Sequence, residues 1–502
     1  MAEVHDSRDL AELFGALLAE EPDLPALVQD GRVMTFREWW SGSALAAGIL
    51  ASKGVRVGDV VCLLLPSGRD FAVWYLGVLR LGAVVSAINP RLGSTEIGHI
   101  IGRCHPVVVV TNTAHRVPSD AAAAVCDPRG PFPCSIAPLR GIVPVPSDAP
   151  AVISWTTGST GLPKGAWFDY QTLRFIAENM GPLSRLHDRK LMPVPFAHAG
   201  FTTRIYDQLL HRCTLVLTPS DWSAESMLDV LETERVTVGQ GVPTQWEKLI
   251  ALDRFSVANL SHLRLVATGA SRVPDNLITM MSRRLGCPVV VRYASTELPL
   301  AFGTRLDDSP RTVATTVGRP LGGAEVDIRS ADGDSARQGR AGRIFLRSPA
   351  MMRGYWDDPE MTAQSVSNDG WLATGDLGVL DEQGNLVILG RADDTYIRGG
   401  YNVYPAEVET ALLEHPAVRR VAVVGTTAPV IGEAGVAFVV TDDHALTGEL
   451  VRDWCRGQIA DYKVPDTVVF VPDLPVNAVF KIDMMRLRAM AADALTDLSR
   501  TT

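Results

Sequence analysis

The sequence predicts an α/β fold with parallel sheets that are covered on both faces. Apolar runs of strand length begin at Val60, Val107, Thr214, Leu263 and Val289, and helical segments separate them. A strand that is apolar at every position has both faces buried, which is typical of parallel sheets in α/β proteins. The chain has 502 residues, of which 46% are hydrophobic and 21% are charged, so it can bury several large cores.

The first half of the chain alternates between helices and strands. Apolar residues at helical spacing predict an amphipathic helix near the start of the chain: Leu10, Leu13, Phe14, Leu17 and Leu18. A second helix is expected from about Asp70, after the strand VVCLLL at Val60. Residues 118–150 are rich in proline, alanine and serine and show no period, so we expect a surface connection there.

The pattern changes after Gly322. The runs AEVDI, GRIFL and GNLVILG are short strands, and turn signals at Asp332-Gly333 and Gln383-Gly384 predict hairpins. After Arg391 a smaller α+β unit is expected, with a helix in PAEVETALLEH, strands in VRRVAVVG and GVAFVV, and a helix over 450–459. We therefore expect two domains, residues 1–391 and residues 392–502.

Composition and charge argue against several classes of protein. A net charge of -10 disfavours broad nucleic-acid binding, which needs a basic surface. The seven cysteines include no CxxC pair, which favours a reducing compartment and buried thiols. The N-terminus lacks a signal-peptide pattern, and Arg80 interrupts the longest apolar stretch, from Phe71 to Ile88, so that stretch is too short to span a bilayer. We expect a soluble, cytoplasmic protein.

The stretch SWTTGSTGLPKG, from Ser154 to Gly165, is the strongest local signal. It follows the apolar strand AVIS and combines many backbone N–H groups with hydroxyls and the cation of Lys164. Glycines let a backbone approach an anion closely, and such a loop forms a nest for phosphate oxygens. The spacing differs from a Walker A loop, in which serine or threonine follows the lysine. Judged alone, the alternative is a flexible linker.

Further motifs accompany this loop, and together they resemble a known family. They are PVPFAHAG at 193–200, TGASRVP at 268–274, YASTE at 293–297, GWLATGDLG at 370–378, GRADDTYIRGGYNVYPAEVE at 390–409, YKVP from Tyr462, and Lys481. With TTGSTGLPKG they are similar, in order and across nearly the whole chain, to AMP-forming acyl-CoA synthetases of the adenylate-forming superfamily. The resemblance implies a large N-terminal domain with parallel sheets and a β-barrel-like part, and a small, mobile C-terminal domain.

The chemistry that this resemblance implies has two steps. A carboxylate attacks the α-phosphate of ATP, which forms an acyl-adenylate and releases pyrophosphate, and the thiol of CoA then displaces AMP. Two anions meet in the first step, so cations and hydrogen-bond donors must be preorganised there. The implied cofactors are ATP or an acyl-adenylate, Mg²⁺ and coenzyme A, and the implied substrate is a small carboxylic acid.

The resemblance gives the nucleotide a set of hydroxyls, amides and one aromatic ring. Lys164 and the loop hydroxyls would hold the β- and γ-phosphates, and Tyr293 would stack on adenine. Asp376 would accept hydrogen bonds from both ribose hydroxyls, and Arg391 would reach the ribose or a phosphate. The whole expected set is Thr156, Thr157, Gly158, Ser159, Thr160, Lys164, Gly269, Ala270, Tyr293, Ala294, Ser295, Asp376 and Arg391.

Four residues are expected to act in the chemistry. Lys481 would bridge the substrate carboxylate and the α-phosphate during adenylation, Thr296 would bond the α-phosphate, and Glu297 would bind Mg²⁺. His198 would line or gate the acyl pocket, and a satisfied structural histidine is its alternative. A surface ion pair is the alternative for Arg391.

The remaining roles concern CoA, the hinge and the acid. Asp393 matches the hinge about which the C-terminal unit turns. The loop Arg398, Gly399, Gly400 and Tyr401 would line the CoA tunnel. The acyl pocket is expected at Phe196, His198, Gly239, Gly241 and Ala270. Small residues there leave room for a wide apolar body, so a polycyclic, aromatic or medium-chain fatty acid fits the pattern.

Two positions depart from the family pattern. Ala294 stands where the family has a glycine against the reacting groups, and an extra methyl in a tight site costs about 1–3 kcal/mol. Phe480 stands where glycine usually precedes the lysine, so backbone freedom beside Lys481 is lost. Both changes affect adenylation, whereas the CoA loop and the hinge are intact. We therefore expect weak or lost adenylation, with thioester formation retained and a second ligase supplying the adenylate.

Other interpretations of these motifs remain open. Drift without consequence at both positions would leave a fully competent two-step synthetase. The departures resemble a diverged ligase of platensimycin-type terpenoid pathways, in natural-product biosynthesis. Amino-acid-activating domains carry an aspartate near PFAHAG, and its absence at 196–198 disfavours them. A luciferase-like oxygenase shares the motifs, and a non-catalytic nucleotide-binding regulator is disfavoured by the retained Glu297, Asp376 and Lys481.

Overall fold

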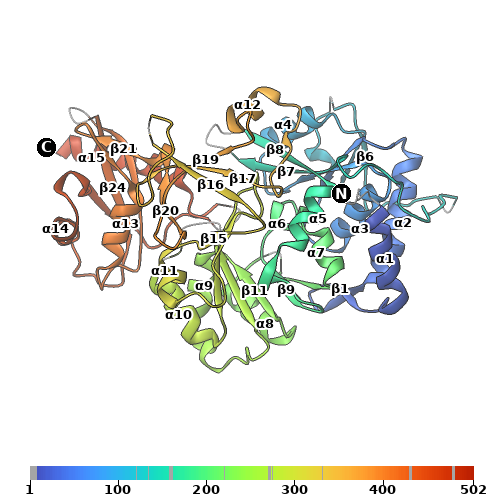
Figure 1. The fold of residues 1–502 in the computed structure, drawn as a ribbon, viewed down its shortest axis with the longest axis horizontal. Helices are drawn as coiled ribbons and strands as arrows, with labels where there is room; N and C mark the ends of the chain where they lie inside the picture. The colour runs from blue at the N-terminus through green and yellow to red at the C-terminus, as the bar shows by residue number, and fades with distance from the viewer. Residues whose placement is uncertain are drawn as a thin grey trace. The chain divides into compact units, whose positions relative to one another are not determined.

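The computed structural model describes residues 8–119, 121–133, 135–157, 162–219, 221–269, 273, 275–330, 332–428, 432–477 and 481–501. The chain forms two compact units: unit 1 is Met1–Glu325 with Leu346–Leu372, and unit 2 is Val326–Phe345 with Ala373–Thr502. The described strands form four sheets (Figure 1). The predicted domain boundary near residue 391 lies within unit 2, and a hinge there stays a prediction.

The larger sheet of unit 1 has nine strands in the order β15-β14-β13-β12-β11-β9-β10-β1-β2. Neighbours from β13 to β1 pair in parallel, and the edge strands pair antiparallel. The strands are β1 (Pro25–Gln29), β2 (Arg32–Thr35), β9 (Arg189–Met192), β10 (Thr214–Leu217), β11 (Val238–Gly241), β12 (Leu265–Gly269), β13 (Val289–Tyr293), β14 (Phe302–Gly303) and β15 (Arg319–Pro320). The parallel strands expected at Thr214, Leu263 and Val289 are confirmed.

Three helices cover one face of this sheet: α8 (Ala224–Thr233), α9 (Pro243–Ile250) and α10 (Asp275–Leu285). Their apolar side chains share one buried cluster with Val266 on β12 and with Val289 and Val291 on β13. The indole of Trp246 on α9 is fully buried in this cluster. Because side chains alternate along a strand, Val290 and Arg292 point to the opposite face of the sheet.

The second sheet of unit 1 has seven strands in the order β18-β8-β7-β4-β3-β5-β6. They are β3 (Val60–Leu64), β4 (Val84–Ile88), β5 (Val108–Thr111), β6 (Ala124–Cys126), β7 (Pro150–Thr157), β8 (Pro163–Asp169) and β18 (Gly354–Tyr355). Every residue of β3, β4 and β5 is buried, as the apolar runs at Val60 and Val107 predict for β3 and β5; β4 was not predicted as a strand. The surface connection expected over 118–150 contains one short strand, β6, which was not predicted and pairs in parallel with β5.

Helices and short turns complete unit 1. The predicted opening helix is confirmed as α1 (Arg8–Glu20), and the helix expected from Asp70 is α3 (Arg69–Arg80). The other helices are α2 (Phe36–Ser52), α4 (Ser94–Cys104), α5 (Tyr170–Glu178), α6 (Ala199–Thr202), α7 (Ile205–Leu210), α11 (Pro310–Thr315) and α12 (Pro359–Ser365), with 3₁₀ turns η1 (Ala114–Arg116), η2 (Gly181–Leu183) and η3 (Asp253–Val257).

Unit 2 contains two sheets. The four-stranded sheet has the order β16-β17-β19-β20, and its hairpin β19–β20 confirms the turn predicted at Gln383-Gly384. A barrel-like part of the N-terminal domain stays a prediction. The second sheet runs β22-β21-β24-β23, with β25 paired to β24. The strands are β16 (Glu325–Arg329), β17 (Gly342–Arg347), β19 (Leu372–Leu380), β20 (Leu386–Arg391), β21 (Tyr396–Arg398), β22 (Tyr401–Val403), β23 (Arg420–Ala428), β24 (Gly432–Val440) and β25 (Thr467–Phe470).

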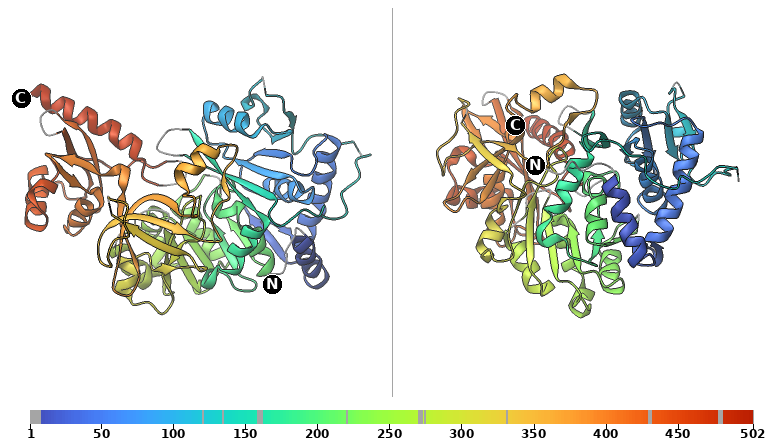
Figure 2. Two further views of the ribbon diagram at one scale, coloured as in Figure 1. Left: turned by 45° about the horizontal axis from the view of Figure 1, so that its top comes forward. Right: turned by 45° about the vertical axis from the view of Figure 1, so that its right-hand side comes forward.

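Helices pack on both faces of this second sheet (Figure 2). The helices α13 (Pro405–Leu413) and α14 (Gly448–Gln458) share one buried cluster with it, and α15 (Met484–Thr501) shares another. Two 3₁₀ turns, η4 (Ala392–Asp394) and η5 (Asp461–Lys463), join these elements. The predicted helices at 405 and 450 and the two long strands are confirmed, whereas β25 and α15 were not predicted.

The described cysteines behave as the spacing predicts. Cys62, Cys104, Cys126, Cys213, Cys287 and Cys455 are all buried and are free thiols. Cys134 lies outside the described residues.

Among the helices that the structure describes, none combines the length and the apolar character needed to cross a membrane.

Candidate functional site

The predicted phosphate loop lies in the sequence between two paired strands of unit 1. The strands β7 and β8 pair antiparallel, and Thr156 lies directly opposite Lys164 at the base of the tip. Nε2 of His99 on α4 lies 3.1 Å from the carbonyl oxygen of Pro163 in the next register pair. The predicted donors Gly158, Ser159 and Thr160 lie outside the described residues, as does the side chain of Thr157. The hairpin therefore places a hydroxyl and an ammonium on either side of this tip.

A tyrosine that the sequence analysis missed joins Lys164 to Glu297. The ammonium of Lys164 lies 5.8 Å from the centre of the Tyr355 ring, and the Tyr355 hydroxyl donates a hydrogen bond of 2.9 Å to Oε1 of Glu297. Burial, followed by the charge of Glu297, raises the pKa of Tyr355 well above its usual range, so the phenol stays protonated and remains a donor. One ring thus holds the predicted phosphate-binding cation and the predicted metal-binding carboxylate in one region.

Backbone pairing brings Tyr355 to this place. Its strand β18 adds to the edge of β8, with Tyr355 opposite Ala166, and the backbone N–H of Trp356 donates to the carbonyl of Gly165. The N–H of Met352 donates to the carbonyl of Glu297 itself. The segment MMRGYW at 351–356 is the sequence signal that could have identified Tyr355, because an aromatic residue follows a glycine there. The same segment forms hydrogen bonds with Gly165 and Glu297, which belong to two of the motifs.

The YASTE segment forms a tight turn at the end of β13. The N–H of Ser295 donates to the carbonyl of Leu298, and the N–H of Leu298 donates to the Ser295 hydroxyl, each over 3.1 Å. Ala294 and Ser295 are exposed, and Thr296 and Glu297 are half-buried. The extra methyl of Ala294 is therefore not packed into the core, and its effect on a ligand stays a prediction.

Gly269 approaches the backbone of the next strand so closely that only glycine fits. A Cβ at this position would lie 2.0 Å from the carbonyl oxygen of Arg292, and the φ of Gly269 is +153°. Glycine adopts this backbone conformation readily, whereas a residue with a side chain is strained there. Ala270, predicted beside it in the nucleotide and acyl sites, lies outside the described residues.

We expect Gly269→Ala to lower the free energy of unfolding by about 2–5 kcal/mol, through the clash and the strained φ together. Gly286→Ala is the matched control: its φ is +67° and no atom lies within 4 Å of the added Cβ, so only the conformational cost of about 1–2 kcal/mol applies. Thermal and urea unfolding of both variants provide the measurement. Equal losses for the two variants would contradict the close approach at Gly269.

The two residues predicted to bind the ribose lie together in unit 2. Asp376 on β19 is the register partner of Arg391 on β20, and Nη1 of Arg391 lies 3.5 Å from Oδ1 of Asp376. The Asp376 side chain is 15% exposed and the Arg391 side chain 50% exposed. The backbone N–H of Asp376 also donates to the Thr374 hydroxyl. The pair supports a shared role, and the ion pair that was the alternative for Arg391 is present.

The structure fixes the backbone of Lys481 at the base of a loop. The N–H of Lys481 donates to Oδ1 of Asn477, and the N–H of Asn477 donates to the carbonyl of Lys481. Val476 and Ile482 form an antiparallel bridge beside them. Phe480, the second departure from the family pattern, lies outside the described residues.

The predicted CoA loop is a two-residue β-hairpin. Gly399 and Gly400 join β21 to β22, with φ values of +56° and +87°, which only glycine, asparagine or aspartate adopt readily in a turn of this kind. The guanidinium of Arg398 donates to both carboxylate oxygens of Asp466, and this hydrogen bond raises the pKa of Arg398. The exposed ring of Tyr401 stacks on Tyr462, with centroids 4.6 Å apart. Arg398 thus anchors the loop, and the exposed Tyr401 is available to a ligand.

The predicted hinge residue lies in the short turn η4. The guanidinium of Arg488 on α15 contacts the carbonyl of Asp393 at 3.4 Å and Oδ1 of the neighbouring Asp394 at 2.5 Å. Burial raises the pKa of Asp394, and the charge of Arg488 opposes that shift. This contact holds the turn to α15, and no pattern in the sequence predicts it.

Two of the residues predicted for the acyl pocket lie at α6. Phe196 is buried and stacks on Phe201, with ring centroids 3.7 Å apart. His198 is the N-cap of α6, where its Nδ1 accepts a hydrogen bond from the N–H of Gly200. This bond supports the structural alternative for His198, and its position in a pocket stays a prediction.

The two glycines predicted for the acyl pocket, Gly239 and Gly241, lie on β11 against the indole of Trp246. A Cβ at either position would lie about 3 Å from the ring, at 3.0 Å and 2.9 Å respectively. The space beside these glycines is therefore filled by Trp246. Their proposed part in the acyl pocket depends on their backbone atoms.

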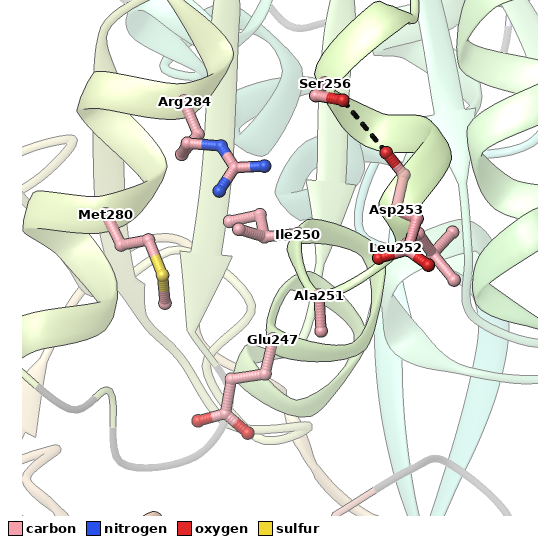
Figure 3. Close-up of a pocket in the computed structure, with 8 residues that line it drawn as sticks. All are labelled: Glu247, Ile250, Ala251, Leu252, Asp253, Ser256, Met280 and Arg284. Carbon is pink, nitrogen blue, oxygen red and sulfur yellow. Dashed lines mark hydrogen bonds between the residues drawn. The ribbon is translucent and has the colours of Figure 1, made fainter.

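A cavity of about 410 Å³ is lined by residues that belong to none of the motifs (Figure 3). It is lined by α9, η3 and α10, with Glu247, Met280 and Arg284 among the residues around it. None of the predicted site residues lines it, so we do not assign it to the reaction.

Among the described residues, no group of three or more His, Cys, Asp or Glu side chains is placed to hold a metal ion.

Comparison with known proteins agrees with these motifs. The family model of AMP-binding enzymes matches residues 16–356, and the model of the AMP-binding enzyme C-terminal domain matches residues 407–481. The chain is 34% identical to the indoleacetate–CoA ligase of Aromatoleum aromaticum over 96% of this chain and 98% of the relative. It is 30% identical to the long-chain-fatty-acid–CoA ligase FadD13 of Mycobacterium tuberculosis over 89% of this chain and 91% of the relative.

Solved structures show the same fold. ATP-bound MatB from Rhodopseudomonas palustris superposes with a TM-score of 0.88 at 27% identity, covering 96% of this chain and 99% of that chain. The anthranilate CoA ligase AuaEII in complex with anthranoyl-AMP superposes with a TM-score of 0.87 at 25% identity, covering 98% of both chains.

Proposed function

The chain belongs to the family of AMP-binding enzymes, and we propose that it is an acyl-CoA ligase, an acid–thiol ligase that acts through an acyl-adenylate. The observation that carries this proposal is the group formed by Lys164, Tyr355 and Glu297. It combines a cation beside the phosphate hairpin with a carboxylate that a protonated phenol orients. The curated relatives that join carboxylic acids to CoA support the same chemistry.

In adenylation, we assign binding of the triphosphate to unit 1. Thr156 and Lys164 hold phosphate oxygens, and Gly158, Ser159 and Thr160, which lie between them in the sequence, are the predicted further donors. An oxygen of the acid attacks the α-phosphorus, the bond from that phosphorus to the bridging oxygen breaks, and pyrophosphate leaves with the electron pair. Thr296 donates to the α-phosphate, and Lys481 neutralises charge as the two anions meet.

Glu297 fits the role of a Mg²⁺ ligand. Mg²⁺ is commonly held by one or two carboxylates together with substrate phosphates and water, so a single protein carboxylate suffices. Bound there, Mg²⁺ would neutralise negative charge on the phosphates. Oε1 of Glu297 accepts the hydrogen bond from Tyr355, which orients the carboxylate. This assignment is part of our proposal.

Replacing Tyr355 by phenylalanine tests that orientation. A hydrogen bond to a charged group is worth about 1.5–3 kcal/mol, so we expect Tyr355→Phe to weaken MgATP binding roughly 10- to 100-fold. Isothermal titration with MgATP measures the change. Tyr396→Phe is the matched control, since its hydroxyl is buried without a hydrogen-bond partner among the described residues. Unchanged MgATP affinity in Tyr355→Phe would remove Tyr355 from the site.

In the second step, the CoA thiolate attacks the acyl carbonyl carbon, the bond to the AMP oxygen breaks, and AMP leaves. We propose that the hairpin at Gly399-Gly400 and the ring of Tyr401 contact CoA. Two observations support a loop that is ready for this step: the turn has the conformation its glycines favour, and Arg398 anchors it to Asp466. Asp376 and Arg391 are proposed to hold the ribose of the nucleotide.

We further propose that adenylation is the weaker half-reaction in this chain. The exposed methyl of Ala294 supports this, because it lies where the family has no side chain. A partner ligase would then supply the adenylate, and the terpenoid origin of the chain stays a prediction. The alternative is a fully competent two-step synthetase for an aromatic, polycyclic or fatty acid. A non-catalytic nucleotide-binding regulator is the alternative from another class.

One pair of assays separates these functions. Pyrophosphate release from ATP and a panel of acids measures adenylation, and thioester formation from synthetic acyl-adenylates with CoA measures the second step. Rapid thioester formation with little pyrophosphate release is the expected result. Rapid pyrophosphate release would show a competent synthetase and refute the weak half-reaction. Absence of both activities would refute the ligase and favour the regulator.

A further inference from the structure

Two buried hydroxyl groups join β7 to the segment that the sequence predicts for the acyl pocket. Oγ of Ser154 on β7 lies 2.5 Å from Oγ1 of Thr202 on α6, and both residues are fully buried. The two residues are 48 positions apart in the chain, so motif spacing gives no sign of this hydrogen bond. The N-cap of α6 is His198, one of the residues predicted for the acyl pocket. The bond therefore connects two parts of unit 1 to which we assign different substrates.

Ser154 points to the same face of its sheet as the residues that we assign to the phosphates. Its neighbours Ile153 and Trp155 pack into the apolar cluster that also contains the buried side chains of α4. Because side chains alternate along a strand, Ser154 and Thr156 point to the opposite face. Lys164 is the register partner of Thr156 on β8 and shares that face. The helix α6 thus contacts β7 two residues before the first proposed phosphate-binding group, on the same side of the sheet.

Thr202 is also fixed from its other side. Its carbonyl accepts a hydrogen bond of 2.6 Å from the Tyr75 hydroxyl, and its N–H donates to the carbonyl of His198 at 3.1 Å. Burial raises the pKa of Tyr75 well above its usual range, so this hydroxyl stays protonated and remains a donor. The ring of Tyr75 packs edge-on against Phe201, with centroids 5.6 Å apart. Since α6 is held to the core in this way, the Thr202 hydroxyl relates the position of α6 to that of β7.

Stability alone does not require a hydroxyl pair at this place. Replacing both partners of a buried hydrogen bond by apolar groups of the same shape can be nearly neutral for the free energy of unfolding. A hydrogen bond differs from apolar packing in being directional, so it fixes both the separation and the orientation of the two elements that it joins. The pair of Ser154 and Thr202 is therefore suited to alignment of α6 on β7.

We propose that Ser154 and Thr202 are positioning residues for adenylation, and that their bond aligns the acid held beside α6 with the phosphates held beside β7. This inference rests on the proposed ligase function. An oxygen of the acid must lie in line with the α-phosphorus, and a misplacement of about 1 Å in such a geometry can cost about 100-fold in rate. In the acyl-adenylate a covalent bond joins the acyl group to the phosphate, so the second step no longer depends on this alignment.

Removing the two hydroxyls, singly and together, tests the alignment. We expect Ser154→Ala, Thr202→Val and the double variant each to lower kcat for exchange of labelled pyrophosphate into ATP by about 10- to 100-fold. The KM for MgATP and the rate of thioester formation from a supplied acyl-adenylate should stay within about threefold of the natural chain. The double variant should lose no more than the larger single loss, because one substitution already breaks the bond.

Two further variants separate alignment from support of the fold. Thr202→Ser keeps the hydroxyl and should keep pyrophosphate exchange within about threefold of the natural chain. Thr203→Val removes the neighbouring buried hydroxyl, which donates to the carbonyl of Ala199 within α6 at 2.7 Å. It should lower the melting temperature and leave the ratio of the two half-reactions unchanged. If a single variant fails to fold, the double variant decides, since it leaves no unpaired hydroxyl at this place.

The outcomes distinguish this inference from the proposed function. A double variant that retains both its melting temperature and the natural exchange rate overturns the positioning role. So does a double variant that loses both half-reactions in equal measure, because the bond then supports the fold. Thioester formation without any pyrophosphate exchange in the natural chain leaves the ligase standing and removes the positioning role. Absence of both half-reactions in the natural chain refutes the ligase, and the positioning role falls with it.

Discussion

Lys481→Ala should reduce pyrophosphate release by about 10²- to 10³-fold, while thioester formation from a supplied acyl-adenylate changes little. Removing one preorganised donor at a developing charge costs this much in rate, and adenylation brings two anions together. In the second step the acyl group is already activated, so this charge is no longer required. The structure supports a defined position for Lys481, because two hydrogen bonds to Asn477 close its backbone at the base of the loop.

The measurement must allow for a weak starting rate. Exchange of labelled pyrophosphate into ATP is sensitive enough, and the substitution is made both in the natural chain and in a chain with Ala294→Gly. Lys463→Ala is the comparison: Lys463 lies in the same unit and pairs with Glu407, so its loss shows what removing a paired lysine of that unit does to both half-reactions. Equal loss of both half-reactions in Lys481→Ala would show that the lysine supports the fold or both conformations instead.

The fold was predictable where local pattern decides it. The strands at Val60 and Val108 are buried at every position, and a continuous apolar run signals that environment without reference to distant residues. The turn at Gly399-Gly400 was predictable for a similar reason, because the backbone conformation of a two-residue hairpin selects glycine. The short edge strand β6 was missed, since three residues carry no period.

The site was predictable only in part, because several of its contacts join distant segments. Tyr355 donates to Glu297 across 58 positions of sequence, and the contact between Arg488 and Asp394 spans 94. Motif spacing reports residues that lie near one another along the chain, and it gives no sign of such pairs. A small residue is also ambiguous in sequence: the space beside Gly239 and Gly241 reads as room for a ligand, but Trp246 fills it.

Ala294→Gly combined with Phe480→Gly should raise pyrophosphate release by about 5- to 150-fold. The range corresponds to the cost of roughly 1–3 kcal/mol for an extra group in a tight site. Ala294 carries the structural part of this argument: it is exposed at the end of β13, so removing its methyl opens no cavity in the core and should leave the melting temperature nearly unchanged. Phe480→Gly restores backbone freedom beside the lysine.

Each single substitution and the double substitution should be compared for both half-reactions. Thioester formation from a supplied adenylate should stay within about threefold of the natural chain, because the CoA hairpin and its anchor at Asp466 are unaltered. Ala267→Gly serves as the control: it removes a methyl from the neighbouring strand β12, where the side chain is buried, and should lower stability without raising pyrophosphate release. If neither glycine substitution raises pyrophosphate release, the side chains of Ala294 and Phe480 do not limit the rate of adenylation in the natural chain. A synthetase that carries out both steps then accounts for the family membership, and no partner ligase is needed to supply the adenylate.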